Sequence, residues 1–393
     1  MKSVTDLKLN GKRVLVRVDY NLPMDEHQAI TDDNRIRETL PLLNYLRENQ
    51  AKIIVASHMG RPKGKPDPAQ SLYPASRRLS ELIGGEVGFV ADCIGPEAQA
   101  RVDALGRGEI LVLENLRFHP GEAKNDVEFA RQLAGLCDVF VNDAFAVSHR
   151  SAASIVAITE LVPECAAGFL LEKELAAFHS SVQNPVRPLV AVIGGAKVSS
   201  KLEALENMIN RVDTLIIGGA MANTFLKSTG VDTGKSMVEE DLVETAAKIL
   251  EKARAKGISL LLPKDVVVAQ SFSNDAPSRV VSVGSIPPDW MALDIGPDTA
   301  DLFAAAVKGA GTIVWNGPMG VFEMESFGHG TRVVAEAIAG SGAFSVVGGG
   351  DTGLAVKVFN LSQKMSYIST GGGAFLYLME GKDLPGALAL EKS

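Results

Sequence analysis

The chain has 393 residues, more than one hydrophobic core usually holds, so two domains are expected. Its 46% hydrophobic and 22% charged residues are typical of a globular protein and exclude a disordered one. A formal net charge of −8 argues against nucleic acid or an anionic membrane as a partner, because both require a basic protein surface.

The N-terminal stretch and the cysteines indicate the compartment. Charges interrupt the apolar stretches of the first 21 residues, so no signal peptide is expected, and no apolar run approaches the roughly 20 residues that span a bilayer. Cys93, Cys137 and Cys165 show no CxxC spacing and are interpreted as buried, reduced thiols rather than as redox groups or metal ligands. We therefore expect a cytoplasmic protein.

Residues 1–168 alternate short β-branched runs with helical patterns, which predicts βα units and a parallel sheet. The expected strands are residues 14–18, 52–57, 110–113 and 139–141. A helix is expected over residues 171–182, and Pro185 and Pro188 end it. Residues 169–188 are accordingly interpreted as an interdomain helix and hinge, although an ordinary linker fits the same pattern.

The alternation resumes over residues 189–378, which predicts a second α/β domain. The expected strands are residues 189–193, 214–217, 259–262, 312–315, 344–347 and 366–369, and clear helical patterns cover residues 199–209 and 238–256. The two halves differ in composition, since residues 1–168 hold 13 of the 18 arginines but only 12 of the 38 glycines. Arginine forks suit the carboxylate and phosphate of a small acid, whereas glycines let the backbone approach a polyphosphate, so different ligands are expected.

Ligands of parallel sheets bind beyond the carboxyl ends of the strands, where the first half gathers basic and amide groups. The candidate residues that follow its strands, together with two arginines of a helix start, are Asp19, Tyr20, Asn21, Arg35, Arg37, His58, Met59, Gly60, Arg61, Arg117 and Arg150. Any one of these arginines is more simply read as a surface residue, and His58 as a structural imidazole. Their clustering at strand ends favours an anion site, for a phosphate or a carboxylate.

Glycines follow the strands of the second half, at residues 194–195, 218–219, 317–320, 348–350 and 371–373. Such junctions aim backbone amides and helix N-termini at a polyphosphate. Lys197 and Lys201 lie four residues apart on one face of a helix start, where they could contact phosphate oxygens or remain solvated. Asp351 could cap a helix or hold Mg²⁺.

Two familiar motifs are imperfect. Gly234-Lys235-Ser236 lacks the earlier glycine of a P-loop, because Thr229 stands at that position. The GGGDTG sequence at residues 348–353 satisfies GxGxxG but lacks the acidic residue expected about 20 positions later. A dehydrogenase built on this motif, or a two-domain solute-binding protein, would be the alternative functional class.

The segments VLVRVDYNLP, ITDDNRIRETLP, ASHMGRPKGK, LVLENLRFHPGEAKND, VNDAFAVSHR, IGGAKVSSKL, IIGGAMANTFL, VWNGPMGVFE, GGGDT and STGGGAFL occur in this order between residues 14 and 376. Together they resemble the motifs of the phosphoglycerate kinase family. Two positions depart from that pattern, since Ala146-Val147-Ser148 replaces a usual Gly-Thr-Ala and Tyr20 a usual Phe. Neither change removes a charged group, but the first concerns the loop before Arg150.

The resemblance implies two α/β domains with Rossmann-like parallel sheets that face each other across a cleft, and a segment 379–393 that returns to the N-terminal domain. It implies reversible phosphoryl transfer between 1,3-bisphosphoglycerate and ADP, giving 3-phosphoglycerate and ATP in glycolysis and gluconeogenesis. The implied contacts to 3-phosphoglycerate are Asp19, Asn21, Arg35, His58, Arg61, Arg117 and Arg150. The implied contacts to Mg²⁺-bound ATP or ADP are Lys197, Lys201, Asn316, Glu323 for the ribose, Gly349, Gly350, Thr352, and Asp351 for the metal.

The implied chemistry needs little proton transfer. The acceptor is a carboxylate with a pKa of roughly 3.5, so it is already ionised at pH 7 and no general base is required. Positioning and charge neutralisation remain, and we assign Arg35 and Lys197 to the transferring phosphoryl group as catalytic residues. A monomer is expected.

Overall fold

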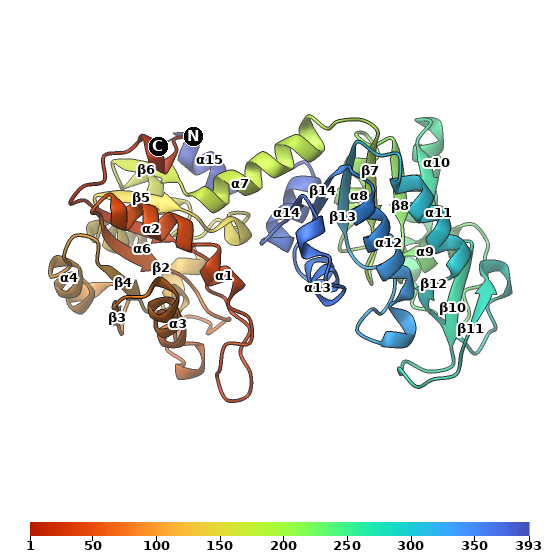
Figure 1. Ribbon diagram of the computed structural model, residues 1–393, viewed down its shortest axis with the longest axis horizontal. Coiled ribbons are helices and arrows are strands. Elements are labelled where there is room, and N and C mark those ends of the chain that lie inside the picture. The colour runs from red at the N-terminus through yellow and green to blue at the C-terminus, as the bar shows by residue number, and fades with distance from the viewer. Residues whose placement is uncertain (393) are drawn as a thin grey trace. The chain divides into compact units, whose positions relative to one another are not determined.

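The computed structural model describes residues 1–392, and the chain divides into two compact units (Figure 1). The first unit contains residues 1–175 and 383–392, and the second contains residues 176–382. The division falls inside α7 (Phe169–Phe178), which continues into a π-helical turn over His179–Gln183. Among the described residues, no helix is long and apolar enough to cross a membrane.

The first unit contains a six-stranded, wholly parallel sheet in the order β3-β4-β2-β1-β5-β6. Its strands are β1 (Arg13–Arg17), β2 (Lys52–Ala56), β3 (Val87–Val90), β4 (Ile110–Leu113), β5 (Val139–Asn142) and β6 (Glu164–Ala167). Its helices are α1 (Asn34–Arg37), α2 (Leu40–Glu48), α3 (Tyr73–Ile83), α4 (Gly95–Asp103), α5 (Pro120–Ala123), α6 (Val127–Gly135) and α15 (Pro385–Lys392). The strands are buried on both faces because crossover helices flank the sheet (Figure 1).

The second unit contains a parallel sheet in the order β15-β14-β13-β7-β8-β9 and an antiparallel sheet in the order β11-β10-β12. The parallel strands are β7 (Leu189–Ile193), β8 (Thr214–Ile217), β9 (Ser259–Leu261), β13 (Thr312–Asn316), β14 (Phe344–Val347) and β15 (Tyr367–Ile368). The antiparallel strands are β10 (Asp265–Ala269), β11 (Ser278–Ser282) and β12 (Met291–Ile295). The helices are α8 (Leu202–Met208), α9 (Met221–Ser228), α10 (Val243–Ala255), α11 (Pro297–Val307), α12 (His329–Gly340), α13 (Asp351–Val358) and α14 (Gly372–Met379).

The predicted architecture of two parallel-sheet α/β units is confirmed, and the predicted strands form within one or two residues of their expected ends. The sequence reasoning missed β3, β6 and the antiparallel sheet. Helix α8 begins at Leu202, three residues later than expected, so Lys201 is its N-cap residue rather than part of its first turn. All three cysteines are buried, as predicted.

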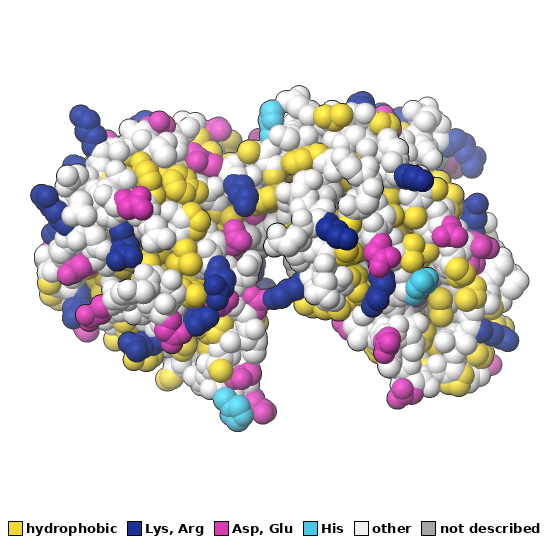
Figure 2. Space-filling model, in the orientation of Figure 1, with side chains coloured by type: hydrophobic (Ala, Val, Ile, Leu, Met, Phe, Trp, Pro, Cys, Tyr) yellow, Lys and Arg dark blue, Asp and Glu magenta, His cyan; other side chains and the backbone are white. Residues whose placement is uncertain are grey.

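The surface carries charges of both signs. Figure 2 shows Lys and Arg side chains interspersed with Asp and Glu over the face that it presents. Charges of the two signs are thus mixed on this face.

Candidate active site

The first unit gathers its basic residues beyond the carboxyl ends of four neighbouring strands. β4, β2, β1 and β5 are adjacent in the sheet and parallel, so the segments that follow them leave from one edge. These segments carry Asp19 after β1, His58 after β2, Arg117 in the 3₁₀ turn Leu116–Phe118 after β4, and Arg150 after β5. Arg35 comes from α1.

His58 is buried at this edge and lies at the centre of the group. Its Nδ1 is 3.3 Å from an Arg17 guanidinium nitrogen, and a guanidinium can only donate, so Nδ1 accepts and Nε2 carries the proton. Burial lowers the pKa of His58 well below its usual value, and the charges of Arg17, Arg117, Arg35 and Arg150 lower it further. The imidazole is therefore neutral at pH 7 and offers a ligand one N–H donor.

These four arginines around His58 form what we call the basic cluster. Burial lowers the pKa of Arg117 to about 10, and repulsion from Arg150 and Arg17 contributes to the decrease. Arg117 donates to the Gly60 carbonyl over 2.7 Å, which fixes its guanidinium. An anion bound among these arginines would relieve their mutual repulsion.

Asp19 and Asn21 organise the polar side of the basic cluster. Asp19 accepts from Arg35 over 2.5 Å and from the Asn21 backbone N–H over 3.0 Å. The Asn21 side chain accepts from the Gly60 N–H over 2.8 Å. Gly60 has a φ of +59°, a conformation that favours glycine, and a Cβ there would lie 2.0 Å from the Gln70 side-chain oxygen, so a larger residue would have to displace the Gln70 side chain.

Arg17 was missed by the sequence reasoning because it lies inside a strand rather than after one. It is 1% exposed, and it donates to Ser154 Oγ over 2.9 Å and to the Val18 carbonyl. Glu122 provides the counter-charge at 3.9 Å and itself accepts from the Ser154 backbone and hydroxyl. The position of Arg17, a charged residue at the end of a β-branched run, was the one signal in the sequence that could have identified it.

Three of the expected substrate-binding residues, Tyr20, Met59 and Arg61, differ from the others in exposure or in their partners. The Tyr20 side chain is buried in the core, and its hydroxyl is 2.8 Å from Thr39 Oγ1. Both Tyr20 backbone groups also have partners within the chain, Ser57 Oγ and the Leu22 N–H. Met59 is buried as well, whereas Arg61 is exposed.

In the second unit the strand ends approach one another so closely that only glycines fit. A Cβ on Gly194, after β7, would lie 2.2 Å from the Pro318 carbonyl oxygen, after β13. A Cβ on Gly219, after β8, would lie 2.5 Å from the Gly195 nitrogen. Side chains are thus excluded here, and the backbone forms the floor of the site.

Lys201 lies on this floor, and its ammonium group is held by one residue. Nζ donates to the Asn316 side-chain oxygen over 2.5 Å and to the Asn316 carbonyl over 2.8 Å. Burial lowers the pKa of Lys201 to about 8, while Asp351 acts in the opposite direction. The structure therefore brings together three predicted residues, Lys201, Asn316 and Asp351.

A cavity of about 580 Å³ opens beside these residues, and we call it the glycine-lined cavity. Its walls include Gly195, Gly219, Pro318, Met319, Gly320, Val321, Val266, Phe272, Leu293, Ile295, Glu323 and Asp351. The volume and the mixture of apolar walls with a few polar groups suit a nucleotide-sized ligand. Glu323 and Asp351, both predicted site residues, lie at its walls, and the Thr352 hydroxyl accepts from the Gly317 N–H over 2.7 Å.

The remaining predicted residues lie at the neighbouring strand ends. Lys197 is exposed in the segment between β7 and α8. Gly349 and Gly350 form the turn after β14, and Gly350, with φ of +76°, is the N-cap residue of α13. The loop 348–351 thus leads directly into a helix N-terminus that begins at Asp351.

Asp294 is a wall residue that the sequence reasoning missed. It is buried, accepts from the Gly330 and Ile295 N–H groups over 2.8 and 2.9 Å, and burial raises its pKa to about 7. It lies on β12 of the antiparallel sheet, which supplies one wall of the cavity. Because that sheet was not predicted, no signal pointed to Asp294.

Comparison with known proteins gives one consistent result. A family model described as phosphoglycerate kinase matches residues 4–382. The phosphoglycerate kinase of Desulforapulum autotrophicum is 67% identical over all of both chains, and that of Desulfosudis oleivorans is 57% identical over all of this chain and 99% of its own.

Solved structures agree with this. Phosphoglycerate kinase from Coxiella burnetii has a TM-score of 0.91 and 44% identity, covering 99% of this chain and 98% of its own. The enzyme from Pyrococcus horikoshii has a TM-score of 0.87 and 34% identity, covering 100% and 98%. The chain therefore belongs to the phosphoglycerate kinase family, and is an enzyme of glycolysis that transfers a phosphoryl group between 1,3-bisphosphoglycerate and ADP, giving 3-phosphoglycerate and ATP.

Proposed function

We propose that the basic cluster of the first unit binds the phosphoglycerate substrate, and that the glycine-lined cavity of the second unit binds the nucleotide. The observation that carries the assignment is Lys201, a partly buried lysine on a floor of bare backbone beside a nucleotide-sized cavity. With its pKa lowered to about 8, Lys201 still carries its charge at pH 7, and anionic oxygens would stabilise that buried charge.

The acid site can exchange an internal ion pair for a substrate. Arg35 is paired with Asp19 in the structure and carries a side chain that is one-third exposed. We propose that Arg35 turns to the substrate's anionic group, while Asp19 and Asn21 accept from its hydroxyl. Arg61, Arg117, Arg150 and the neutral Nε2–H of His58 would hold its phosphate and carboxylate.

The nucleotide would place its phosphates on the backbone floor and its base between the apolar walls. Lys201 and Asn316 would contact the phosphates, with the Gly349-Gly350 turn and Thr352 at the start of α13. Glu323, at the cavity wall, is proposed to accept from the ribose hydroxyls. The carbonyl groups that now hold Lys201 would be replaced by stronger, anionic acceptors.

The residues present fit Mg²⁺ held jointly with nucleotide phosphates. Asp351 places a carboxylate at the cavity wall, close enough to Lys201 to affect its pKa, and Mg²⁺ commonly takes one or two carboxylates together with phosphate oxygens. When bound, the ion would neutralise charge on the phosphates. Asp351 would hold it, and Lys201 would remain with the phosphates.

Catalysis would then rest on charge placement. The acceptor carboxylate is ionised at neutral pH, so no side chain needs to remove a proton. We propose that Arg35 and Lys197 stabilise the charge of the transferring phosphoryl group. We further propose that the enzyme acts as a monomer in the cytoplasm, where its three free, buried cysteines would remain reduced.

Calorimetry of separate ligands tests the assignment. Lys201→Ala is expected to weaken MgADP binding and to leave 3-phosphoglycerate binding unchanged, and Arg117→Ala is expected to do the reverse. Lys248→Ala, which removes an exposed lysine paired with Glu244, is the matched control and should change neither. Equal losses of both ligands in Lys201→Ala would refute the separation. The activity of the unaltered chain and of each variant is measured by a coupled assay of ADP formation from 3-phosphoglycerate and MgATP.

A further inference from the structure

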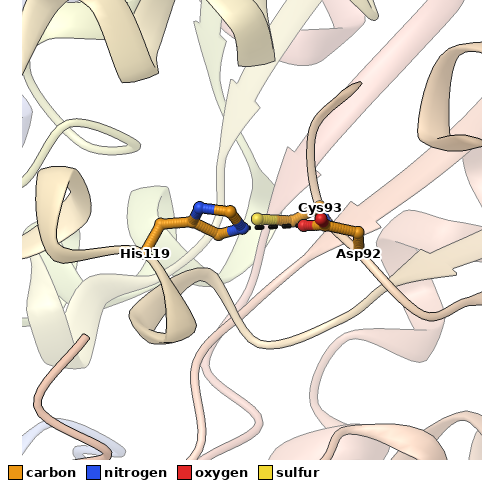
Figure 3. A group of neighbouring side chains, drawn as sticks. All are labelled: Asp92, Cys93 and His119. Atoms are coloured by element: carbon orange, nitrogen blue, oxygen red, sulfur yellow. Dashed lines mark hydrogen bonds and ion pairs between the residues drawn. The ribbon is translucent and has the colours of Figure 1, made fainter. Parts of the chain in front are cut away.

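A second group of polar side chains lies in the first unit, apart from the basic cluster. Among residues 1–392, Asp92, Cys93 and His119 are the one trio of potential metal ligands whose ligand atoms all lie within 4.8 Å of one another. Figure 3 shows the imidazole of His119 facing the Asp92 carboxylate, with the Cys93 sulfur beside them. None of the three is among the residues assigned above to the substrate or to the nucleotide.

Sheet topology explains why Asp92 and His119, 27 positions apart, meet. Asp92 and Cys93 follow β3, and His119 follows β4 after one 3₁₀ turn. β3 and β4 are adjacent and parallel, with Val90 opposite Leu113 at their ends, so the two segments leave the same edge of the sheet. Neighbouring positions at a strand end are where parallel sheets commonly place functional groups.

The three side chains are held in place before any ion arrives. His119 Nε2 is 2.7 Å from Asp92 Oδ1, which also accepts from the Cys93 N–H over 2.7 Å. The His119 ring is stacked on Phe129 of α6, with ring centroids 5.4 Å apart and an interplanar angle of 29°. Stacking and hydrogen bonding leave the imidazole little freedom to turn away.

We propose that Asp92, Cys93 and His119 form a binding site for a zinc-class divalent transition-metal ion. A thiolate, an imidazole nitrogen and a carboxylate oxygen are the ligands that zinc takes, whereas Mg²⁺ and Ca²⁺ prefer oxygen alone. One thiolate and one carboxylate carry two negative charges, so a divalent ion would give a neutral, partly buried site.

The geometry requires only a small adjustment. Ligand atoms on a tetrahedral zinc ion, with bonds of about 2.0–2.3 Å, lie about 3.3–3.6 Å apart. The His119–Asp92 contact of 2.7 Å would lengthen, and the sulfur, no farther than 4.8 Å from either, would approach by about 1.5 Å at most. Binding releases the thiol proton of Cys93 to the solvent and leaves the imidazole neutral, with its proton on Nδ1.

The fourth position of the ion would be open. A cavity of about 570 Å³ is lined by Asp92 and His119 together with Asp67, Ser71, Tyr73 and Glu114, whereas Cys93 is not part of its lining. The sulfur therefore approaches from the protein side, and the opposite side faces the cavity. Three protein ligands with a water in the fourth position is the arrangement of open zinc sites.

Cobalt spectroscopy on the full-length protein tests the proposal. Protein freed of metal with a chelator is titrated with Co²⁺, and we expect one ion per chain, a thiolate-to-cobalt charge-transfer band and the visible bands of four-coordinate cobalt. Zn²⁺ should abolish these bands by displacement. It should also raise the thermal unfolding midpoint, since an ion that binds the folded state stabilises it.

Variants assign the ligands. Cys93→Ser should lose the charge-transfer band, and His119→Gln should weaken Zn²⁺ binding at least about 10-fold. Cys137→Ser removes another buried thiol and His27→Gln an exposed imidazole, and both controls should bind as the unaltered chain does. Unfolding midpoints without metal identify any variant that folds poorly, and Asp92→Asn gives a third, independent ligand change.

Two results would overturn the proposal. One is no Co²⁺ or Zn²⁺ binding by the unaltered chain at about 100 μM metal, well above the range of specific sites. The other is binding without a thiolate band, or with an unchanged band in Cys93→Ser, which would place the ion elsewhere on the chain.

Discussion

With Lys201 in its proposed contact with the nucleotide phosphates, its lowered pKa should make nucleotide affinity depend on pH in a predictable way. Its pKa is about 8 without ligand, because burial disfavours the ammonium form. Phosphate oxygens would favour that form and raise the pKa in the complex. Only the protonated enzyme then binds tightly, so affinity is present below pH 8 and is lost as the pH rises above it.

The magnitude follows from the fraction of Lys201 that is protonated. With a pKa of about 8, this fraction falls from about 0.9 at pH 7 to about 0.1 at pH 9. The Kd for MgADP should therefore rise about 10-fold over this range, or about 1.4 kcal/mol. At pH 8, binding should take up about half a proton from the buffer.

Calorimetry measures both quantities. MgADP is titrated at pH 7, 8 and 9, and the pH 8 titration is repeated in Tris and in a buffer of low ionisation enthalpy to count protons. Lys201→Met should bind about 10–100-fold more weakly, because a charged hydrogen bond is lost, and should show neither the pH dependence nor the proton uptake. Any pH dependence that remains in Lys201→Met comes from titration of the nucleotide itself and can be subtracted. A flat Kd in the unaltered chain, or the same slope in Lys201→Met, would refute the reasoning.

Three further changes test other parts of the structure. Burial raises the Asp143 pKa to about 7, so the protonated carboxyl stabilises the fold at low pH and this contribution is lost as the pH rises through 7. Asp143→Asn does not titrate, so between pH 5 and pH 8 its free energy of unfolding in urea should rise by about 2–3 kcal/mol relative to that of the unaltered chain; parallel curves would contradict this. Glu122→Gln should lower the free energy of unfolding in the same assay by about 3 kcal/mol, because it leaves buried Arg17 without its counter-charge. Glu128→Gln removes a charge from an exposed ion pair and should lower it by less than about 1 kcal/mol. Arg35→Ala should lower kcat about 10²–10³-fold with little change in KM, and Arg37→Ala, on the same helix, should be nearly silent; a raised KM with unchanged kcat would remove Arg35 from its assigned role.

The strand ends explain how much of the site could be predicted. A β-branched run followed by Gly-Gly or by His and Arg is readable along the chain, and parallel topology brings such segments to one edge. Lys201 and Asp351 were found in this way and Asn316 through the family resemblance, and the structure places the three together. Their roles toward a ligand are a matter for the experiments above.

The rest could not be predicted, because it depends on contacts between segments distant in sequence. Arg17 belongs to the basic cluster only because Ser154 and Glu122 hold it inside the fold. The antiparallel sheet was missed because β11 is largely exposed and shows no alternation of buried and exposed residues. Asp92 and His119 share no local motif, so nothing in their spacing predicts that they meet.

The basic cluster shows how a site is built before its ligand arrives. Burial of the Arg17 charge costs desolvation free energy. Hydrogen bonds to Ser154 and Val18 and the charge of Glu122 offset this cost. Its position in turn fixes Nδ1 of His58 as an acceptor, so the Nε2 proton is already present for a ligand. For Arg17 and His58, reorganisation that would otherwise accompany binding is therefore completed during folding, whereas Arg35 would still have to leave Asp19. Preorganised charges of this kind are the ones that stabilise a transferring group most effectively. Glu122 thus stabilises the fold and, through the same ion pair, keeps the charge of Arg17 in place beside His58.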